Sequence, residues 1–172
     1  MNRLALWAVC LMLLIAVITD IKSRRIPNWM VLPGMLAGII ASVFFSGWHG
    51  LAQSLEGFLL SAAVFGVLAC LKGMGMGDVK LCAAIGAWIG PSQMFIALIL
   101  ISLFGGVVAI LWAIKDRFLV EMFKNIWRLL RGVTDRGLRP HPELVLSNPA
   151  THKMPYAPVI AVGTLLSFLA TK

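Results

Sequence analysis

Charged residues are scarce in this chain, and acidic ones are scarcer still. Only 13% of its 172 residues are charged and only seven are Asp or Glu, whereas a typical soluble domain has about 25% charged residues. By contrast, 60% of the residues are hydrophobic, which is more than the core of a soluble domain of this size needs. The shortage of charge therefore excludes an ordinary soluble domain and indicates that the apolar surface is buried in a bilayer.

Cysteine and histidine are also sparse. The three cysteines are odd in number and lack CxxC spacing, and the three histidines are scattered along the chain. These patterns predict neither a disulfide framework nor a zinc site. No Ser-His or Cys-His arrangement, phosphate-binding loop or metal cluster is suggested either. The sequence therefore implies no metal and no organic cofactor.

The lengths of six apolar segments predict an all-α, polytopic membrane protein with six transmembrane helices. These segments cover residues 4–19, 29–46, 51–71, 78–90, 93–114 and 155–170. The fourth is short, because a helix of this length spans only about 20 Å of a hydrocarbon core of roughly 30 Å. Either this helix extends at its ends, or non-helical backbone that lines a wet cavity precedes it. The alternating glycines of residues 73–77 favour the second alternative.

The positive charges predict the orientation. With the N-terminus outside, all Lys and Arg residues except Arg3 and Lys172 fall in cytoplasmic segments. This orientation obeys the positive-inside rule and the reverse one violates it. The first segment has no small-x-small cleavage site and is followed by the heavier positive charge, which favours a retained helix over a signal peptide. The net charge of +8 fits anionic lipid of the cytoplasmic leaflet better than nucleic acid, since the cations flank the spans.

One sizeable polar segment, at about 115–154, precedes the last span. Its first half has apolar residues at three- and four-residue steps, with Lys124, Arg128 and Arg131 on the remaining face. This pattern predicts a cytoplasmic amphipathic helix that anchors to the headgroup layer, with a substrate-docking face as the alternative. The second half is rich in proline, which is typical of an irregular loop. We expect residues 1–172 to form a single domain into which this loop is inserted.

The acidic residues lie in different settings. Four of them belong to the polar segment and are explained as solvated charges: Asp116, Glu121, Asp135 and Glu143. Glu56 lies inside the third apolar segment, where a carboxylate is costly and often functional, although it would be structural if it reached the outer interface. Asp20 ends the first apolar segment and Asp78 opens the fourth. The six-span topology places these last two at the same depth, at the cytoplasmic edge of the membrane.

Asp20 and Asp78 each have an ordinary explanation when taken singly. Asp20 would be a solvated residue at a helix end, and Asp78 would be a helix N-cap, a common role for Asp after glycines. As a pair they are candidates for an aspartic dyad. In such a dyad an ionised carboxylate takes a proton from the attacking water, and a protonated carboxyl donates to the scissile carbonyl. Two carboxyls held close together do not both ionise easily, so the pair shares one proton.

Two motifs resemble conserved blocks of the type IV prepilin peptidases. The stretch DIKSRRIPN, residues 20–28, is similar to their first block. The stretch GMGDVKL, residues 75–81, is similar to their GxGD block, which signal peptide peptidases and presenilins share in outline. The short chain and the late motif PYAP at 155–158, followed by Gly163, resemble the minimal branch that serves Flp-type (Tad) pili. The resemblance extends over residues 5–170 and is weakest over 115–150.

This resemblance implies a membrane endopeptidase of the bacterial inner membrane with Asp20 and Asp78 as its catalytic aspartates. It also implies positioning roles for six neighbours: Gly75, Gly77, Lys80, Ile26, Pro27 and Asn28. The two glycines would let the backbone approach the substrate or the partner aspartate, and the Ile-Pro-Asn stretch would set the turn after the first aspartate. The family removes short basic leaders from prepilins or pseudopilins at the cytoplasmic face, which is the side that the charges predict.

One departure from the family pattern concerns a second activity. Larger members carry a cytoplasmic domain with paired CxxC motifs and methylate the new N-terminus of the pilin. This chain has neither the cysteines nor the room for that domain. The resemblance therefore implies leader cleavage without methylation.

Two other classes of function stay open on the sequence pattern alone. A small transporter or channel component would use the two aspartates to relay protons or bind a cation. It would be expected to carry acidic residues near mid-membrane on several spans, and only Glu56 qualifies. A non-catalytic scaffold of a secretion machine would tolerate Asp-to-Asn exchange.

Overall fold

A computed structural model describes residues 3–70, 74–115 and 155–170 of the chain. These residues form four helices: α1 (Arg3–Ser23), α2 (Asn28–Cys70), α3 (Met76–Lys115) and α5 (Ala157–Ala170). They contain no strand, so the predicted all-α class is confirmed for this part of the chain. The amphipathic helix and irregular loop predicted for about 115–154 lie outside the described residues, apart from the end of α3.

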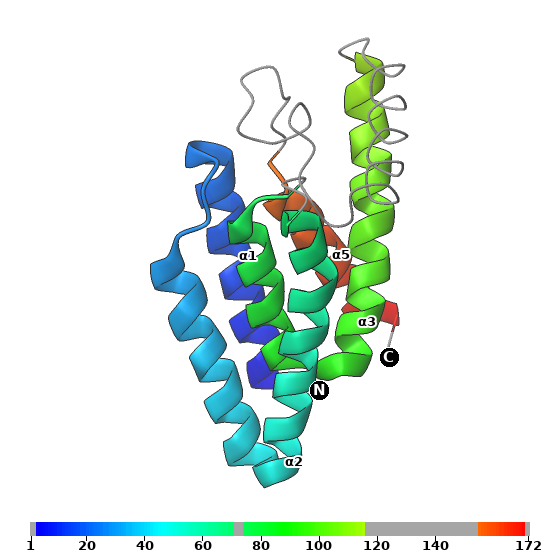
Figure 1. Ribbon diagram of the computed structural model, residues 1–172. Coiled ribbons are helices and arrows are strands. Elements are labelled where there is room, and N and C mark those ends of the chain that lie inside the picture. The colour runs from blue at the N-terminus through cyan, green and yellow to red at the C-terminus, as the bar shows by residue number, and fades with distance from the viewer. Residues whose placement is uncertain (1–2, 71–73, 116–154, 171–172) are drawn as a thin grey trace.

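Two of the helices turn back on themselves at a glycine. Gly47 (φ 56°, ψ −138°) interrupts α2, and Gly90 (φ 74°, ψ 175°) interrupts α3 immediately before Pro91. Glycine adopts positive φ without the steric cost that a Cβ atom brings, and proline suits the first position of the helix that follows. Each helix therefore consists of two arms that run in opposite directions (Figure 1). The arms of α2 are residues 28–46 and 48–70, and those of α3 are residues 76–89 and 91–115.

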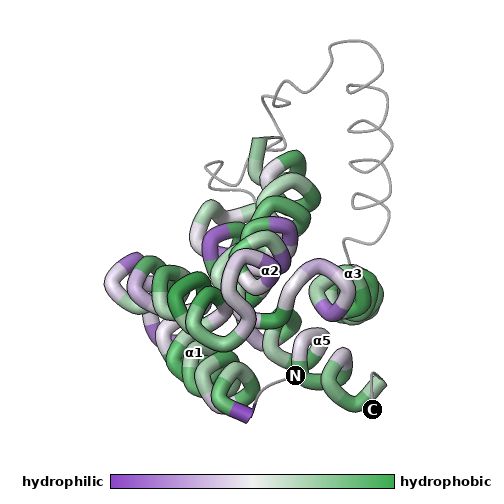
Figure 2. Tube along the Cα trace, turned by 90° about the horizontal axis from the view of Figure 1, so that it is seen from below, coloured by the Kyte–Doolittle hydropathy of each residue, from purple (hydrophilic) through white to green (hydrophobic). Residues whose placement is uncertain are grey.

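The outward faces of the helices carry many large apolar side chains. Among the most exposed hydrophobic side chains are Trp7, Phe44 and Trp48, at 72%, 82% and 85%, and Figure 2 shows hydrophobic residues along much of each helix. By length and composition α1, α2 and α3 are candidate membrane spans, and α5 is a shorter apolar helix. A soluble monomer rarely exposes contiguous apolar surface of this extent. The chain is therefore an integral membrane protein.

Within the described residues the predicted apolar segments lie largely in helices, and their ends differ from the predicted ones by a few residues. α1 continues past residue 19 to Ser23, and the hydroxyls of Thr19 and Ser23 bond back to carbonyls of the preceding turn. Asp20 is therefore part of the helix. In the fourth segment the helix begins at Met76, and Met74 and Gly75 before it are not helical. The helix extends beyond the predicted start, as in the first alternative, and non-helical backbone precedes it, as in the second; the wet cavity of the second alternative stays a prediction.

The second arm of α2 and the first arm of α3 pack backbone against backbone. A Cβ atom on Gly57 would overlap the carbonyl oxygen of Gly86, and one on Gly86 would overlap that of Gly57. Two buried hydroxyls complete the contact, since Ser54 donates to the carbonyl of Ala87 and Ser61 to that of Gly57, both at 2.7 Å. Such close approach stabilises helix pairs in membranes, where packing and hydrogen bonds drive association. This contact fixes the position of the first arm of α3 along the axis of the bundle, and with it the position of Asp78.

Replacing Gly57 by Ala should destabilise the protein, because the new methyl group meets the main chain of α3 and not a side chain that can rotate away. Overpacking of this kind costs roughly 1–3 kcal/mol, so the midpoint of thermal unfolding in detergent should fall. Gly66→Ala is the matched control, because Gly66 lies on the same arm and a Cβ atom there meets nothing within 4 Å. Equal midpoints for the two variants would contradict the close contact.

Candidate active site

The two predicted aspartates lie at the same end of the helix bundle. Asp20 is in the last turn of α1 and Asp78 is in the first turn of α3. Figure 1 shows these two helix ends near the start of α5, at the end of the bundle opposite the hinge at Gly47. The two carboxyls are close enough for the charge of Asp20 to act on Asp78. The fold therefore brings together two acidic side chains that are far apart in the sequence.

Asp20 is buried, with only 6% of its surface exposed. Its Oδ2 atom accepts a hydrogen bond of 3.0 Å from the backbone N–H of Ala157, the first residue of α5. Its main chain is fixed as well, because its carbonyl accepts a bond of 2.8 Å from the N–H of Arg24. Arg24 has a φ of 50° and ends α1 in the left-handed conformation typical of helix C-termini. The interpretation of Asp20 as a solvated residue at a helix end is therefore wrong.

Asp78 is half-buried and is the third residue of α3. It lies inside the first helical turn, so it is not the N-cap. Its N–H donates to the carbonyl of Gly75 at 3.1 Å. Its carboxylate folds back over Gly75 and interacts with the backbone there, and a Cβ atom on Gly75 would lie 3.0 Å from Oδ2. Gly75 thus leaves room for a carboxylate that is still partly accessible to a substrate.

The remaining predicted residues join the turn after α1 to the start of α3. Ile26 packs against Gly77, where a Cβ atom would lie 3.2 Å from the Cβ of Ile26. The Nζ of Lys80 donates to Oδ1 of Asn28 at 3.2 Å. The carbonyl of Pro27 accepts hydrogen bonds of 3.2 and 3.4 Å from the first turn of α2. All six predicted neighbours therefore lie at the aspartate end, and their contacts hold the two aspartate-bearing segments together.

Three further residues lie beside the pair and were not assigned to the site from the sequence. Cys82, one helical turn after Asp78, is fully buried and within range of its charge. Tyr156 is half-buried, is influenced by the charge of Asp78, and packs its hydroxyl end against Gly105 of α3. The prolines on either side of Tyr156 could have marked a helix start near the site. Ala157 contributes only its main chain, which no side-chain pattern reveals.

The other acidic and metal-binding residue types are not gathered into a second site. Within the described ranges, no group of three or more His, Cys, Asp or Glu side chains could hold a metal ion. Glu56 is exposed on the second arm of α2. Its neighbour Gly57 touches Gly86, which lies eight residues, or about 12 Å, along α3 from Asp78. Glu56 therefore does not join the aspartates, and its position gives no support to a relay of protons between helices.

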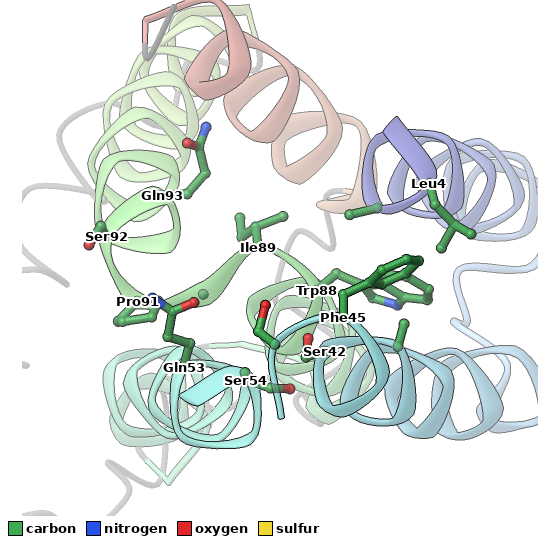
Figure 3. Close-up of a pocket in the computed structure, with 15 residues that line it drawn as sticks. Leu4, Ser42, Phe45, Gln53, Ser54, Trp88, Ile89, Pro91, Ser92 and Gln93 are labelled. Carbon is green, nitrogen blue, oxygen red and sulfur yellow. The ribbon is translucent and has the colours of Figure 1, made fainter. Parts of the chain in front are cut away.

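A cavity lies at the other end of the helices from the aspartates. Its volume is about 470 Å³, and it is bounded by α1, both arms of α2 and the hinge of α3 (Figure 3). Leu4 lines it, at the opposite end of α1 from Asp20. Its polar lining consists of Ser42, Ser46, Gln53, Ser54, Ser92 and Gln93. The cavity borders Gly90, so the short first arm of α3 ends at a polar-lined space.

A single cysteine introduced at one end of the bundle should react with a reagent added on one side of the membrane, and a single cysteine at the other end should react from the opposite side. In a variant whose three native cysteines are replaced by alanine, Met76→Cys marks the aspartate end and Ser46→Cys marks the cavity. Both side chains are exposed, so a membrane-impermeant maleimide should label each from one side only. Ala84→Cys, at a fully buried position, should stay unlabelled until the protein is unfolded. Labelling of both exposed positions from the same side would contradict this arrangement.

Comparison with known proteins identifies the family. The Type IV leader peptidase family matches residues 7–110, which is more than half of the chain and includes both aspartates. The prepilin leader peptidase/N-methyltransferase of Escherichia coli (strain K12) is 27% identical over 139 residues, which cover 74% of this chain and 60% of that protein. Proteins with the same name from Neisseria gonorrhoeae and Xanthomonas campestris pv. campestris are 34% and 32% identical, and their alignments cover 53% and 54% of this chain.

These relatives are considerably longer than the matched region. The alignments cover 34% of the Neisseria gonorrhoeae protein and 34% of the Xanthomonas campestris protein, so the chain spans at most 60% of the length of the three relatives. No solved structure matches the chain. The family match covers most of α1, all of α2 and most of α3, and both paired aspartates lie within it. The chain belongs to the Type IV leader peptidase family.

Proposed function

We propose that this protein is an aspartic endopeptidase that removes the short basic leader from prepilins or pseudopilins at the cytoplasmic face of the bacterial inner membrane. The observation that carries the proposal is the pair of carboxyls, Asp20 and Asp78, whose charges interact at one end of an apolar helix bundle. Membership of the family supports the reaction class, and both aspartates lie in the matched residues 7–110. The names of the longer relatives support prepilins as the substrate class.

In the proposed mechanism the two carboxyls act on one water molecule. The ionised carboxylate takes a proton from water as its oxygen attacks the carbonyl carbon of the scissile bond, and the protonated partner donates to the carbonyl oxygen. The C–N bond of the resulting tetrahedral diol then breaks as the newly protonated carboxyl gives its proton to the leaving amine. The other carboxylate takes a proton from a hydroxyl of the diol as the new carboxyl group forms, which restores the singly protonated pair. Because Oδ2 of Asp20 is engaged by Ala157, Oδ1 is the oxygen through which Asp20 would meet the water.

We propose a six-span topology to account for the side on which cleavage occurs. The spans would be α1, the two arms of α2, the two arms of α3, and α5. With the N-terminus outside, the aspartate end faces the cytoplasm, and the exposed cations Lys22, Arg24 and Arg25 meet the anionic lipid of that leaflet. Residues 1–172 would then form one peptidase domain, with about 115–154 as a cytoplasmic loop.

We further propose Flp-type pilins as the substrates, because the PYAP motif at 155–158 resembles that of the branch that serves these pili. Methyl transfer is not part of the proposal. The sequence has three cysteines and no CxxC motif, whereas bifunctional members of the family carry paired CxxC motifs. The proposed activity is cleavage of the leader.

Replacing either aspartate by Asn should abolish leader cleavage, because the amide keeps the shape of the side chain but neither accepts nor donates the required proton. Loss of acid–base catalysis lowers rates by about 10²–10⁴-fold. Cleavage is scored as a mobility shift of a prepilin from the same genome, co-expressed with each variant, and membrane fractionation checks that the enzyme inserts. Glu56→Gln, which removes an exposed carboxylate outside the pair, should retain cleavage. Cleavage by Asp20→Asn or Asp78→Asn would defeat the proposal.

The pH dependence of cleavage should be bell-shaped. At low pH both carboxyls are protonated and no base is available, whereas at high pH both are ionised and no acid is available. The two limbs report apparent values for the coupled pair and not for either residue alone. The measurement is the initial rate of cleavage by purified enzyme in detergent micelles as the pH is varied. A flat profile would argue against a proton shared by Asp20 and Asp78.

A further inference from the structure

We infer that the start of α5 is a positioning element for the catalytic pair: the backbone N–H of Ala157 orients the carboxylate of Asp20, and the ring of Tyr156 holds that N–H in place. The inference rests on the proposed function, in which Asp20 takes part in peptide hydrolysis. It concerns two residues outside the motifs that carry the aspartates, and it gives the last helix a role in the chemistry.

Asp20 needs a compensating group because its own helix disfavours its charge. It lies in the last turn of α1, where the exposed carbonyls carry the negative end of the helix dipole. It is also buried, and a buried carboxylate without a hydrogen bond is costly. The N–H of Ala157 donates to Oδ2 at 3.0 Å, and the positive end of the α5 dipole lies at the same point. The start of α5 therefore stabilises the negative charge that the end of α1 disfavours.

The donor is held rigidly. Ala157 is completely buried, so water does not compete for its N–H, and a hydrogen bond at low local dielectric is stronger than one in water. The carbonyl of Tyr156 accepts a bond of 3.1 Å from the N–H of Ile160, which closes the first turn of α5. The hydroxyl of Tyr156 lies so close to Gly105 that a Cβ atom there would overlap it. The second arm of α3 therefore sets the position of the turn, and through it the orientation of Asp20.

A purely structural role of the hydrogen bond from Ala157 to Asp20 predicts a different effect of removing it. If the bond served only to cap α5, deleting it would lower the stability of the protein and leave the ionisation of the pair unchanged. If the bond orients and stabilises the Asp20 carboxylate, deleting it also changes the pH at which the pair gains a second proton. The pH profile of cleavage therefore separates the two roles.

The direct experiment replaces the amide of Ala157 by an ester, through incorporation of lactic acid at that position. This change removes one N–H and keeps the methyl side chain. We expect kcat for a same-genome prepilin to fall about 10–100-fold, as for loss of one hydrogen bond to a charged group, with KM unchanged. The acidic limb of the pH profile should move to higher pH, because the carboxylate ion has lost a donor. An ester at Val162, an exposed position of the same helix, is the control and should change neither.

A second set of variants uses ordinary side chains and tests the part played by Tyr156. Gly105→Ala should displace the Tyr156 ring and reproduce the loss of kcat and the shifted acidic limb. Gly106→Ala is the matched control, because a Cβ atom at Gly106 meets nothing within 4 Å. Adding Tyr156→Phe to Gly105→Ala should restore part of the activity, because the hydroxyl oxygen is the atom nearest the added methyl group.

The outcomes separate this inference from the proposed function. If the Ala157 ester keeps the kcat and pH profile of the unmodified enzyme while Asp20→Asn is inactive, the inference is overturned and the proposed function stands. If Asp20→Asn remains active, both fail. Should the ester protein not accumulate, the comparison of Gly105→Ala with Gly106→Ala decides, and identical pH profiles for these two variants would overturn the inference.

Discussion

A carboxylate buried in an apolar helix bundle must be compensated by hydrogen bonds, and the aspartate end of this protein is arranged around that constraint. Asp20 is bonded to the N–H of Ala157, and the side chain of Asp78 interacts with the backbone of Gly75. Both compensating groups belong to main chain at or just before a helix start, where N–H groups have no partner within the helix. The starts of α3 and α5 therefore supply donors that the end of α1, where main-chain carbonyls point outward, does not.

Close contacts between helices set the relative positions of these donors and carboxyls along the axis of the bundle. The backbone contact between Gly57 and Gly86 fixes the first arm of α3 against α2. The turn after α1 is tied to the same arm by the packing of Ile26 on Gly77 and by the bond from Lys80 to the first residue of α2. A displacement of α3 along its axis would break all of these contacts together. The glycines are consequently as important to the geometry of the site as the polar side chains.

The sequence predicted the helices and the aspartate pair because both depend on strong local patterns. Long apolar segments separated by glycines and charged residues must form helices in a bilayer. Acidic residues at the ends of such segments are rare, so Asp20 and Asp78 are easily recognised. The extension of α1 to Ser23, the burial of Asp20 and the donor from Ala157 were not predicted. The first depends on hydroxyls that bond back to the helix, and the others on contacts between residues far apart in the chain. Every residue except proline carries an N–H, so sequence gives no indication of which one meets a carboxylate.

The last helix supplies a hydrogen-bond donor to Asp20 that neither aspartate motif contains. Residues 7–110, which match the family, contain both aspartates but not Ala157, the donor to Asp20. α5 reaches this position by packing along the second arm of α3, where Gly163 contacts Ile101 and Tyr156 contacts Gly105. Those contacts lie on the arm of α3 that does not carry Asp78, so the hinge at Gly90 connects the part of α3 that bears one aspartate to the part that supports the other. The geometry of the pair is therefore a property of the folded bundle as a whole, because the motif that carries Asp20 does not contain the N–H of Ala157 that holds its carboxylate.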